Sequence, residues 1–577
     1  MTRLFNEPSD FADEMVDGFV AANSRWIRRV HGGVVRARRA PAGAVAIVTG
    51  GGSGHYPAFG GFVGEGLTHG AALGNLFASP SWQQVRSVAK SANSGGGVLL
   101  CYGNYAGDVL NFDKAQERLC AEGIETQTVT VTDDISSASV EDRHRRRGVA
   151  GDLVVLKSAG AASDAGYDLA GVKRVATKAN DRTRSFGVAF SGCSLPGEPE
   201  PLFIVPAGRM AVGMGIHGEP GIGEVDVPSA DQLAEQLVTS LLDELPDDIE
   251  QASGQRVALI LNGLGSVKYE ELFVVYAKID ALLDVAGVQV VEPEVGELVT
   301  SFDMAGVSLT LTWLDDELED FWRAPVNAPG YRKVTLPEPA LGELAAAEAV
   351  PDRVVPDAST EARETAARVL LALEASLLAL DKSAVELGRI DAVAGDGDHG
   401  IGMKRGATAA VEAARTYVAL GAGGSTVLNA AGDAWSDRAG GTSGALWGAI
   451  LESMGAEFTD TAHPNSMSIA AAVHRATLAI LEFGAVVGDK TMVDVLVPFD
   501  SALTQQISGG ASLLKAWLAA SAVADKASLA TADLLPRMGR ARPHAEKSLG
   551  TPDAGAISLA LLIREAGDAL LSSQREH

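Results

Sequence analysis

The sequence predicts a multidomain protein, with an N-terminal α/β region of two subdomains followed by a C-terminal all-α domain. Three observations support this fold class. The chain has 577 residues, more than one hydrophobic core usually holds. Short apolar runs alternate with helical stretches in the N-terminal half, as in α/β proteins. The C-terminal part is rich in alanine and shows helical spacing of leucines without alternating strand patterns.

Two apolar runs indicate buried strands, and a polar loop follows each of them. Residues 44–49 lead into the loop Gly50–His55, and residues 97–102 lead into 103–108. Ligands of α/β proteins bind at the carboxyl ends of strands. The first loop is no Walker A motif, because no Gly-Lys-Ser/Thr follows, and Pro57 interrupts any dinucleotide fingerprint. Four further strands are expected, at 153–156, 187–190, 257–261 and 288–291.

The loop 212–221 places His217 among four glycines and ends with Pro220 before the last of them. Glycine lets a ligand approach the main chain closely, and proline stiffens the turn. A neutral imidazole is a competent nucleophile near pH 7, so His217 is a candidate for attack on a ketone carbonyl to give a hemiaminal. The alternative is a turn whose histidine makes only hydrogen bonds. His55 is the second histidine on a glycine loop.

Asn104 and Asp108 follow the second strand, where an amide and a carboxylate can hold hydroxyl groups. The alternative for Asp108 is an ordinary helix cap. The only strongly basic run is 143–147, preceded by Glu141 and Asp142. We expect it to form a solvated loop or a salt-bridge site.

Six prolines mark a linker before the all-α domain: Pro325, Pro329, Pro337, Pro339, Pro351 and Pro356. We therefore expect a first domain at 1–332, a linker at 333–358 and a second domain at 359–577. Thr360 is expected to cap a helix in which Leu370, Leu373, Leu377 and Leu380 follow at helical spacing.

Three carboxylates fall within eight residues of the second domain: Asp391, Asp396 and Asp398. Gly395 and Gly397 permit a tight reversal that lets these carboxylates converge. Their mutual repulsion would be relieved by a hard cation such as Mg²⁺ or Ca²⁺, which prefers oxygen ligands. The spacing is not that of an EF-hand. The alternative is a solvent-exposed acidic loop.

Glycine turns that carry hydroxyl groups or cations follow this acidic loop. They are 439–444, 488–494, 539–542 and 551–555. Backbone N–H groups at such turns can cradle phosphate. A metal site together with phosphate cradles predicts the binding of a magnesium–nucleotide complex. The alternative for each turn is an ordinary helix–helix connection.

The formal net charge is −27, which argues against binding to nucleic acid or anionic membranes. The three cysteines, Cys101, Cys120 and Cys193, form no CxxC motif and fit a reducing compartment. Neither a signal peptide nor an apolar run long enough to span a membrane is visible, so a cytoplasmic protein is expected.

These motifs resemble those of the single-chain, ATP-dependent dihydroxyacetone kinases over nearly the whole length. The N-terminal resemblance lies in 50–55, 104–108, 215–221 and 301–306, and the C-terminal one in 395–400, 440–444, 488–494 and 552–555. The resemblance implies a ketose-binding domain followed by a helical-barrel domain that binds ATP and Mg²⁺. It also implies a domain-swapped homodimer.

The resemblance assigns roles to individual residues. His217 matches the histidine that forms a hemiaminal with the substrate, and His55 and Asp108 match groups that assist proton transfer, with Asp108 as the base for the attacking hydroxyl. Gly52, Ser53, Gly54, His55, Asn104 and Asp108 match the substrate-binding positions. Asp391, Asp396 and Asp398 match the magnesium ligands. The nucleotide contacts match His399, Gly400, Thr442, Ser443, Thr491, Met492, Arg540 and Asp553.

Three positions depart from the pattern usual in dihydroxyacetone kinases. Tyr56 stands in place of Glu, Gly103 in place of Lys, and Leu156 in place of the His of a His-Lys pair. The first two adjoin the sugar pocket, and Gly103 would make room for one more hydroxymethyl group. Together with 262–265 and 292–300, these departures make the chain more similar to the erythrulose kinases of tetritol catabolism. The expected reaction converts D-erythrulose to its 4-phosphate.

Four alternatives to erythrulose phosphorylation exist. Dihydroxyacetone is the nearest rival substrate, and cyclising cleavage of FAD is a second enzymatic possibility. A ketose sensor without catalysis is disfavoured by the intact aspartate triad. A ketose domain that accepts phosphate from a phosphotransfer protein is disfavoured because the kinase half is present in the same chain.

Overall fold

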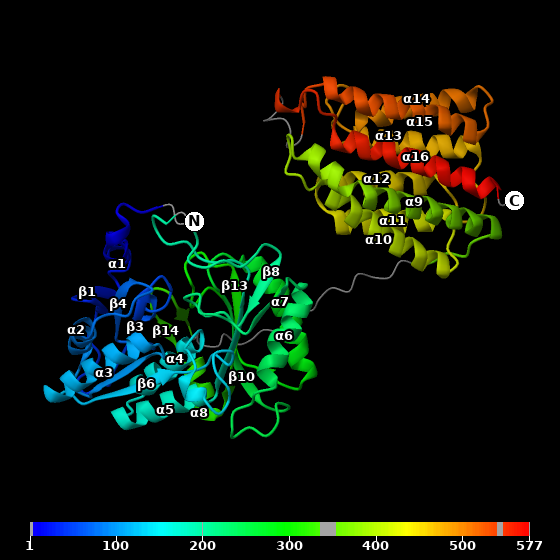
Figure 1. The fold of residues 1–577 in the computed structure, drawn as a ribbon. Coiled ribbons are helices and arrows are strands. Elements are labelled where there is room, and N and C mark those ends of the chain that lie inside the picture. The colour runs from blue at the N-terminus through cyan, green and yellow to red at the C-terminus, as the bar shows by residue number, and fades with distance from the viewer. Residues whose placement is uncertain (1–3, 199, 335–353, 539–545, 576–577) are drawn as a thin grey trace. The chain divides into compact units, whose positions relative to one another are not determined.

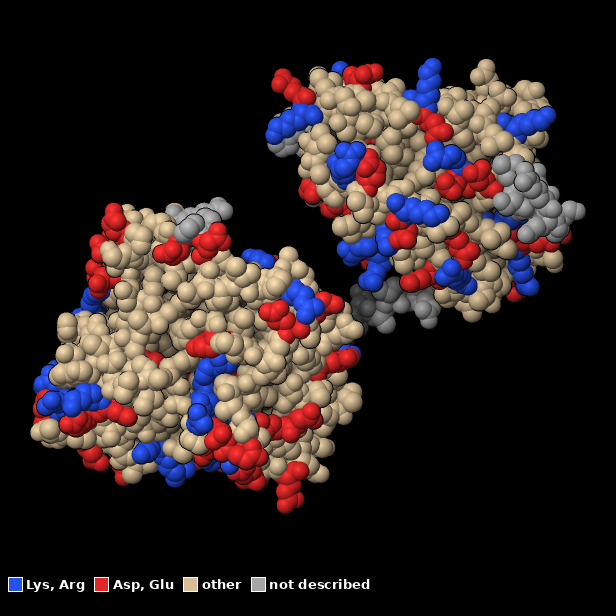
Figure 2. All heavy atoms as spheres, viewed as in Figure 1, with Lys and Arg blue, Asp and Glu red and all other residues tan. Residues whose placement is uncertain are grey.

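The computed structural model describes residues 4–198, 200–334, 354–538 and 546–575. The chain divides into two compact units, residues 1–344 and 345–577 (Figure 1). On the visible face of each unit, acidic and basic side chains are interspersed (Figure 2). Among the described residues, no helix has the length and apolar character required to cross a membrane.

The first unit contains a six-stranded sheet in which the central strands are parallel. Its strands lie in the order β1 (Ile27–Val30), β2 (Gly33–Arg36), β4 (Gly70–Leu76), β3 (Ala46–Ser53), β5 (Val98–Gly103) and β6 (Thr126–Val131). Helices α2 (Trp82–Ala92) and α3 (Ala106–Ala121) pack against it, and α1 (Phe11–Ala22) contacts β1 and β4. The predicted strands at 44–49 and 97–102 are thus confirmed as β3 and β5.

A second, mixed sheet completes the first unit. Its strands lie in the order β11 (Gln289–Val290), β10 (Arg256–Gly263), β13 (Gly306–Leu314), β7 (Thr183–Ala189), β8 (Arg209–Val212) and β9 (Gly223–Asp226), with β12 (Glu294–Gly296) also paired to β10. Helices α6 (Ala230–Leu242) and α7 (Tyr269–Val285) pack on it (Figure 1). The predicted strands at 187–190, 257–261 and 288–291 are confirmed as β7, β10 and β11. The α/β region of two subdomains is therefore confirmed.

The predicted strand at 153–156 is wrong, because these residues lie in helix α4 (Gly151–Asp164). Helix α4 contacts strands of both sheets, including β3 and β13, so nearly all of its residues are buried. A helix buried on every side has no polar face, and its apolar run then looks like a buried strand. Helices α5 (Leu169–Asp181) and α8 (Asp316–Arg323) pack beside α4.

Part of the proline-rich segment belongs to the first unit. Strands β14 (Val326–Asn327) and β15 (Arg332–Lys333) form a short hairpin, and Ala328 and Tyr331 are buried. Pro325 and Pro329 therefore do not lie in a linker. Most of the predicted linker, 335–353, lies outside the described residues.

Over the part of the second unit that the structure describes, eight helices form a closed ring, which confirms the all-α prediction and the helical barrel. The helices are α9 (Thr360–Asp391), α10 (His399–Ala419), α11 (Gly424–Ala439), α12 (Gly441–Glu457), α13 (Ser466–Leu481), α14 (Val493–Ser508), α15 (Leu513–Ala530) and α16 (Ala554–Arg575). Each helix packs on the next, and α16 returns to α9. The interior holds an apolar cavity of about 300 Å³, whose lining includes Trp435, Trp447 and Trp517.

The start of α9 differs by one residue from the prediction. Ser359 is the N-cap, and its side chain accepts a hydrogen bond from the backbone N–H of Ala362. Thr360 is the first helical residue. Along the same helix, Leu373 and Leu380 are buried in the ring, and Leu370 and Leu377 pack against them.

Candidate active site

The carboxyl ends of two neighbouring parallel strands bring His55 and Asp108 to one edge of the first sheet. His55 follows β3, and Asp108 lies in the first turn of α3, which begins just after β5. His217 arrives from the other sheet, on the loop between β8 and β9. The two imidazoles meet with their Nε2 atoms 3.0 Å apart. The three residues predicted to carry the chemistry thus come from two sheets that face α4.

The hydrogen-bond partners of the two histidines fix where their protons lie. The Thr300 carbonyl oxygen only accepts, so His55 Nδ1 carries the proton that it donates across 2.7 Å. His217 Nδ1 lies 3.0 Å from Glu219 Oε1, a carboxylate oxygen that also only accepts. A hydrogen bond between the two Nε2 atoms therefore requires one further proton on the pair. Removal of this proton from His217 leaves its Nε2 lone pair free to attack a carbonyl.

Burial keeps His55 neutral. Its side chain is almost fully enclosed, and desolvation together with the nearby His217 lowers the pKa of His55 to about 3. A proton placed on His55 is therefore acidic and passes readily to a nearby oxygen. By contrast, 22% of the His217 side chain is exposed. His217 is thus accessible to a ligand, while His55 lies behind it.

Glu219 is a partner of His217 that the sequence analysis did not single out. Oε2 accepts a hydrogen bond from the backbone N–H of His217, and Oε1 faces Nδ1 of the same residue. Burial alone would raise the pKa of Glu219, but the hydrogen bond and the charge of His217 lower it to about 2. The carboxylate therefore stays ionised and orients the imidazole ring.

Asp108 differs from Glu219, because its surroundings raise the pKa of its carboxyl group. Burial raises its pKa to about 6, although a hydrogen bond with Ser79 and the charge of His217 act in the opposite direction. Its Oδ1 atom is buried without a hydrogen-bond partner in the described structure. Because Tyr105 is the N-cap of α3, Asp108 is not the cap of this helix. A buried carboxyl with one oxygen atom unpaired and a raised pKa is suited to take a proton from a substrate.

The predicted substrate loop is held mainly by contacts within the protein. Ser53 Oγ donates to the Gly74 carbonyl oxygen across 2.7 Å. A Cβ atom on Gly52 would lie 2.7 Å from the backbone of Phe77, and Gly54 has φ +108°. Gly52 thus permits close packing, and Gly54 permits a left-handed turn. Asn104 donates to the carbonyl oxygens of His144 and Arg146, so its amide nitrogen holds the basic segment.

The positions that depart from the dihydroxyacetone kinase pattern differ in their relation to the site. A Cβ atom on Gly103 would lie 3.2 Å from the Tyr105 ring and 3.4 Å from Asp152 Oδ2, so these side chains adjoin the space expected to be open. Tyr105 itself stacks edge-on with His217. Lys157 is buried and donates to the Ala324 carbonyl oxygen, and burial lowers its pKa to about 7. The charged groups that act on it are Lys333, Glu294 and Glu292, and not the two histidines.

The three predicted metal ligands of the second unit converge. Asp391, at the end of α9, and Asp396 and Asp398, just before α10, bring carboxylate oxygens within 4.8 Å of one another. Gly397 has φ +79° and donates its N–H to Asp391 Oδ2 across 2.8 Å. The side chain of Asp398 makes no capping hydrogen bond to α10, although Asp398 is its N-cap. A set of three carboxylates within this distance fits a hard divalent cation.

Several predicted nucleotide residues adjoin this triad. A cavity of about 40 Å³ is lined by Asp391 at the end of α9, by Lys490 in the loop before α14 and by Asp553 in the loop before α16. Burial raises the pKa of Asp553 to about 6, and its Oδ2 accepts a hydrogen bond from the backbone N–H of Ala556. Lys490, next to the predicted Thr491, donates to the Ser548 carbonyl oxygen.

Other predicted nucleotide residues have structural contacts. His399 lies with Nε2 2.9 Å from Ser558 Oγ, and burial lowers its pKa. A Cβ atom on Gly400 would lie 1.9 Å from the Ala384 carbonyl oxygen, so this glycine lets α10 pack on α9. Thr491 Oγ1 accepts from the N–H of Val493, and Met492 is the buried N-cap of α14.

Thr442 and Ser443 lie in the first turn of α12, after Gly440 and Gly441, which both have φ +59°. Gly440 is the N-cap of α12 and Gly441 its first residue, and the first N–H groups of a helix lack partners within it, as the predicted anion cradle requires. Arg540 lies outside the described residues. The nucleotide role of these residues stays a prediction.

Comparison with known families supports this division of the chain. The Dak1 domain family matches residues 17–330, and the DAK2 domain family matches residues 393–568. The first match contains His55, His217 and Asp108. The second contains Asp396 and Asp398 but begins after Asp391.

Individual proteins match over the full chain. The L-erythrulose kinase of Pectobacterium atrosepticum is 58% identical, over 99% of this chain and 97% of that relative. The D-erythrulose kinase of Mycolicibacterium smegmatis is 52% identical, over 100% of both chains. The crystal structure of the dihydroxyacetone kinase from C. freundii in complex with AMP-PNP and Mg²⁺ is 27% identical, with a TM-score of 0.55 over 98% of this chain and 99% of that one.

Proposed function

This chain belongs to the single-chain dihydroxyacetone kinase family, and from that premise we propose that it transfers the γ-phosphoryl group of ATP to a terminal hydroxyl of erythrulose. The observation that carries the proposal is the pairing of His217 with His55 and Glu219 in one unit, together with the carboxylate triad in the other. The first unit supplies a nucleophile for a ketone, and the second supplies ligands for a metal–nucleotide complex.

We propose that His217 captures the ketose covalently. Its Nε2 atom attacks the carbonyl carbon, and the proton shared with His55 passes to the carbonyl oxygen, which becomes the hydroxyl of a hemiaminal. The alkylated ring is cationic, and Glu219 balances that charge through Nδ1. Capture selects ketones over polyols that lack a carbonyl. It also fixes the terminal hydroxyl for in-line transfer.

Asp108 is proposed as the base that takes the proton from the terminal hydroxyl as its oxygen attacks the γ-phosphorus. The bond from that phosphorus to the bridging oxygen breaks, and ADP leaves. Asp391, Asp396 and Asp398 would hold Mg²⁺, which offsets the charge that develops on the phosphoryl group. The protein then mainly positions the reactants and neutralises charge.

The base role predicts a pH dependence. Because burial raises the pKa of Asp108 to about 6, its carboxylate form is lost as the pH falls through that value. We expect kcat/KM for the ketose to fall about tenfold per pH unit below about 6. A pH profile between 4.5 and 8.5 measures this limb. An acid limb that stays in place in Asp108→Asn would contradict the assignment.

The same variant has an expected effect on stability. A carboxyl whose folded pKa lies above its unfolded value lowers the free energy of unfolding as the pH rises from the unfolded pKa, about 4, to the folded pKa, about 6, and the loss is complete above that value. Asp108→Asn should therefore raise the free energy of unfolding at pH 8, by up to roughly 3 kcal/mol, while lowering kcat by about 10²- to 10⁴-fold. Urea unfolding at pH 8 and at pH 4.5 separates the two effects, because the gain should shrink at the lower pH.

The substrate proposal predicts a preference for four carbons. We expect kcat/KM for erythrulose to exceed that for dihydroxyacetone by at least about tenfold, the usual effect of one added carbon in a fitted pocket. The finer proposal is D-erythrulose, phosphorylated at carbon 4. An ATP-consumption assay with both erythrulose enantiomers and dihydroxyacetone, followed by NMR of the product, tests each part. A preference for the triose would contradict the four-carbon assignment.

We also propose a cytoplasmic homodimer with exchanged domains. The free cysteines and the need for ATP support the compartment, and the family resemblance supports the dimer. Light scattering of the purified chain tests the oligomeric state. In a mixture of two inactive variants, one altered at His217 and one at Asp396, recovered activity tests whether domains of different chains work together.

A further inference from the structure

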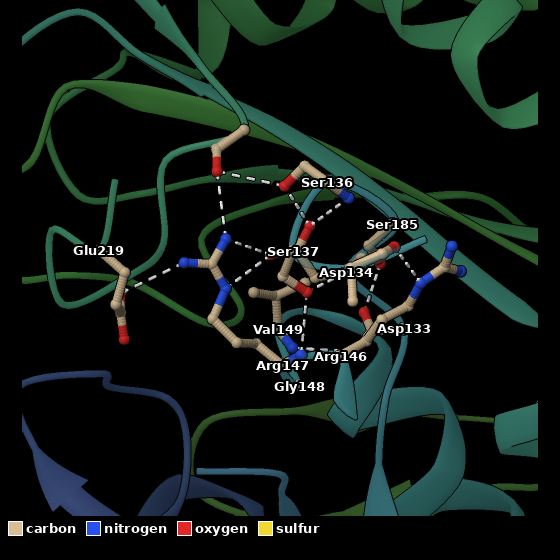
Figure 3. Close-up of polar contacts among 12 residues, drawn as sticks. Asp133, Asp134, Ser136, Ser137, Arg146, Arg147, Gly148, Val149, Ser185 and Glu219 are labelled. Carbon is tan, nitrogen blue, oxygen red and sulfur yellow. Dashed lines mark hydrogen bonds and ion pairs between the residues drawn. The ribbon is translucent and has the colours of Figure 1, made fainter. Parts of the chain in front are cut away.

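An arginine whose side chain is 13% exposed, Arg147, connects both ends of the His217 loop to the rest of the first unit. Arg147 Nη2 donates to the Gly213 carbonyl oxygen across 3.1 Å, at the start of the loop. Arg147 Nη1 lies 3.9 Å from Glu219 Oε2, at its end (Figure 3). Among the described residues, Arg147 is the only Lys or Arg within 4.0 Å of that carboxylate. One guanidinium therefore contacts the loop on each side of His217.

The guanidinium is itself fixed in place. Arg147 Nε donates to Asp134 Oδ2 across 3.0 Å, and the Asp134 side chain is only 5% exposed. The backbone N–H of Arg147 donates to Ser137 Oγ. Ser136 Oγ lies 2.6 Å from Asp134 Oδ1 and 3.1 Å from the Gly213 carbonyl oxygen, so Asp134 and Gly213 are joined a second time (Figure 3). A planar fork held at several atoms has little freedom to move.

Two glycines of the loop are explained by these contacts. A Cβ atom on Gly215 would lie 2.1 Å from Glu219 Oε2 and 2.5 Å from Arg147 Nη1. A Cβ atom on Gly213 would lie 2.6 Å from the Cβ of Ser136, and Gly213 also has φ +71°. A side chain at position 215 would therefore clash with the Glu219 carboxylate and the Arg147 guanidinium, and one at position 213 would clash with Ser136.

We propose that Arg147 is the positioning residue of the covalent step, a role that rests on the function proposed above. It holds Glu219 against Nδ1 of His217, so that Nε2 of the same ring is the atom presented to the ketose. Arg147 acts through Glu219 and the loop and does not touch the substrate. The basic segment 143–147 thus contributes to catalysis through one member, while Arg146 pairs with Glu244 and Arg143 with Asp247.

The test uses the full-length protein with Arg147→Gln, Arg147→Lys and Gly215→Ala, and Arg143→Gln as the matched control. Arg143 lies in the same segment, but its ion pair with Asp247 is on the surface. The readouts are kcat/KM for erythrulose, KM for ATP, the thermal transition, and the NMR signal of erythrulose labelled with ¹³C at the carbonyl. That carbon changes from a ketone to a tetrahedral centre when the adduct forms.

We expect Arg147→Gln to lower kcat/KM about 100-fold, the usual effect of misplacing a reacting group by about 1 Å, and to weaken the adduct signal. KM for ATP should not change. Arg147→Lys keeps a cation beside Asp134 and should restore the thermal transition, but it lacks the fork and should not restore kcat/KM. Gly215→Ala alone should lower kcat/KM, but the double variant with Arg147→Gln should lose little more than Arg147→Gln does. The reason is that both changes separate Glu219 from its support.

Three results would overturn the role of Arg147 and leave the proposed function intact. They are an Arg147→Gln variant within twofold of wild type while His217→Ala is inactive, full recovery of kcat/KM in Arg147→Lys, and an equal loss in Arg143→Gln. If Arg147→Gln does not fold, Arg147→Lys and Gly215→Ala decide the question. A wild-type protein that forms no adduct and transfers no phosphate to any ketose would instead overturn the proposed function, and this inference with it.

Discussion

Replacement of His217 by alanine should abolish the ketose adduct and lower kcat/KM for erythrulose by on the order of 10⁴-fold. The reason is that covalent capture converts the alignment of ketose and ATP from a chance encounter into a fixed geometry, and such alignment contributes large rate factors. Mass spectrometry of the intact protein and ¹³C NMR with carbonyl-labelled erythrulose measure the adduct, and steady-state kinetics measure the rate.

The control for this variant is His474→Ala. His474 pairs with Asp500 on the second unit and has a largely exposed side chain, so it tests the general effect of removing an imidazole. ATP binding should be the same in both variants and in the wild type. If His217→Ala kept an unchanged kcat/KM, covalent capture at this residue would be refuted.

Replacement of Asp396 by asparagine should lower magnesium-dependent turnover by about 10³-fold while the ketose adduct still forms. A carboxylate ligand neutralises the cation and fixes its position, and a bound metal contributes several kcal/mol to transition-state stabilisation. Kinetics over a range of Mg²⁺ concentrations should show that excess metal restores only part of the rate. The adduct signal should equal that of the wild type.

Asp381→Asn provides the matched control for the metal ligand. Asp381 lies on α9, ten residues before Asp391 and therefore about 15 Å away along the helix, and it pairs with Lys404. This variant should retain wild-type turnover. Equal losses in both variants, or a loss of the ketose adduct in Asp396→Asn, would contradict the separation of the two chemistries.

The elements that the sequence predicted well are those whose burial leaves a clear pattern. β3, β5 and β10 are short apolar runs in sheets covered by helices, so their presence could be inferred directly. The predicted end of β3 is wrong, because the strand continues to Ser53, through residues expected to form a loop. The same reasoning failed for α4, because a helix packed between two sheets is also apolar throughout. Local sequence cannot distinguish the two cases, since the difference lies in what surrounds the segment.

The sequence indicated the loops of the candidate site, but not the residues that support them. His55 and Asp108 follow neighbouring parallel strands, which places them at one edge. The glycines around His217 indicated a functional loop, but its supports come from distant segments. Thr300 is 245 residues from His55, and Arg147 is 66 residues from Gly213. The basic segment was correctly expected to form salt bridges, but Arg146 is buried, so a solvated loop is wrong for that residue.

The position of α4 has a consequence for how the first unit can be divided. Because this one helix supplies apolar contacts to β3 of one sheet and β13 of the other, neither sheet has a complete core without it. A chain cut between the two sheets would leave one half with an uncovered helix and the other with an uncovered sheet, and both surfaces would favour aggregation. Although the first unit has two subdomains by topology, we expect it to fold as one piece.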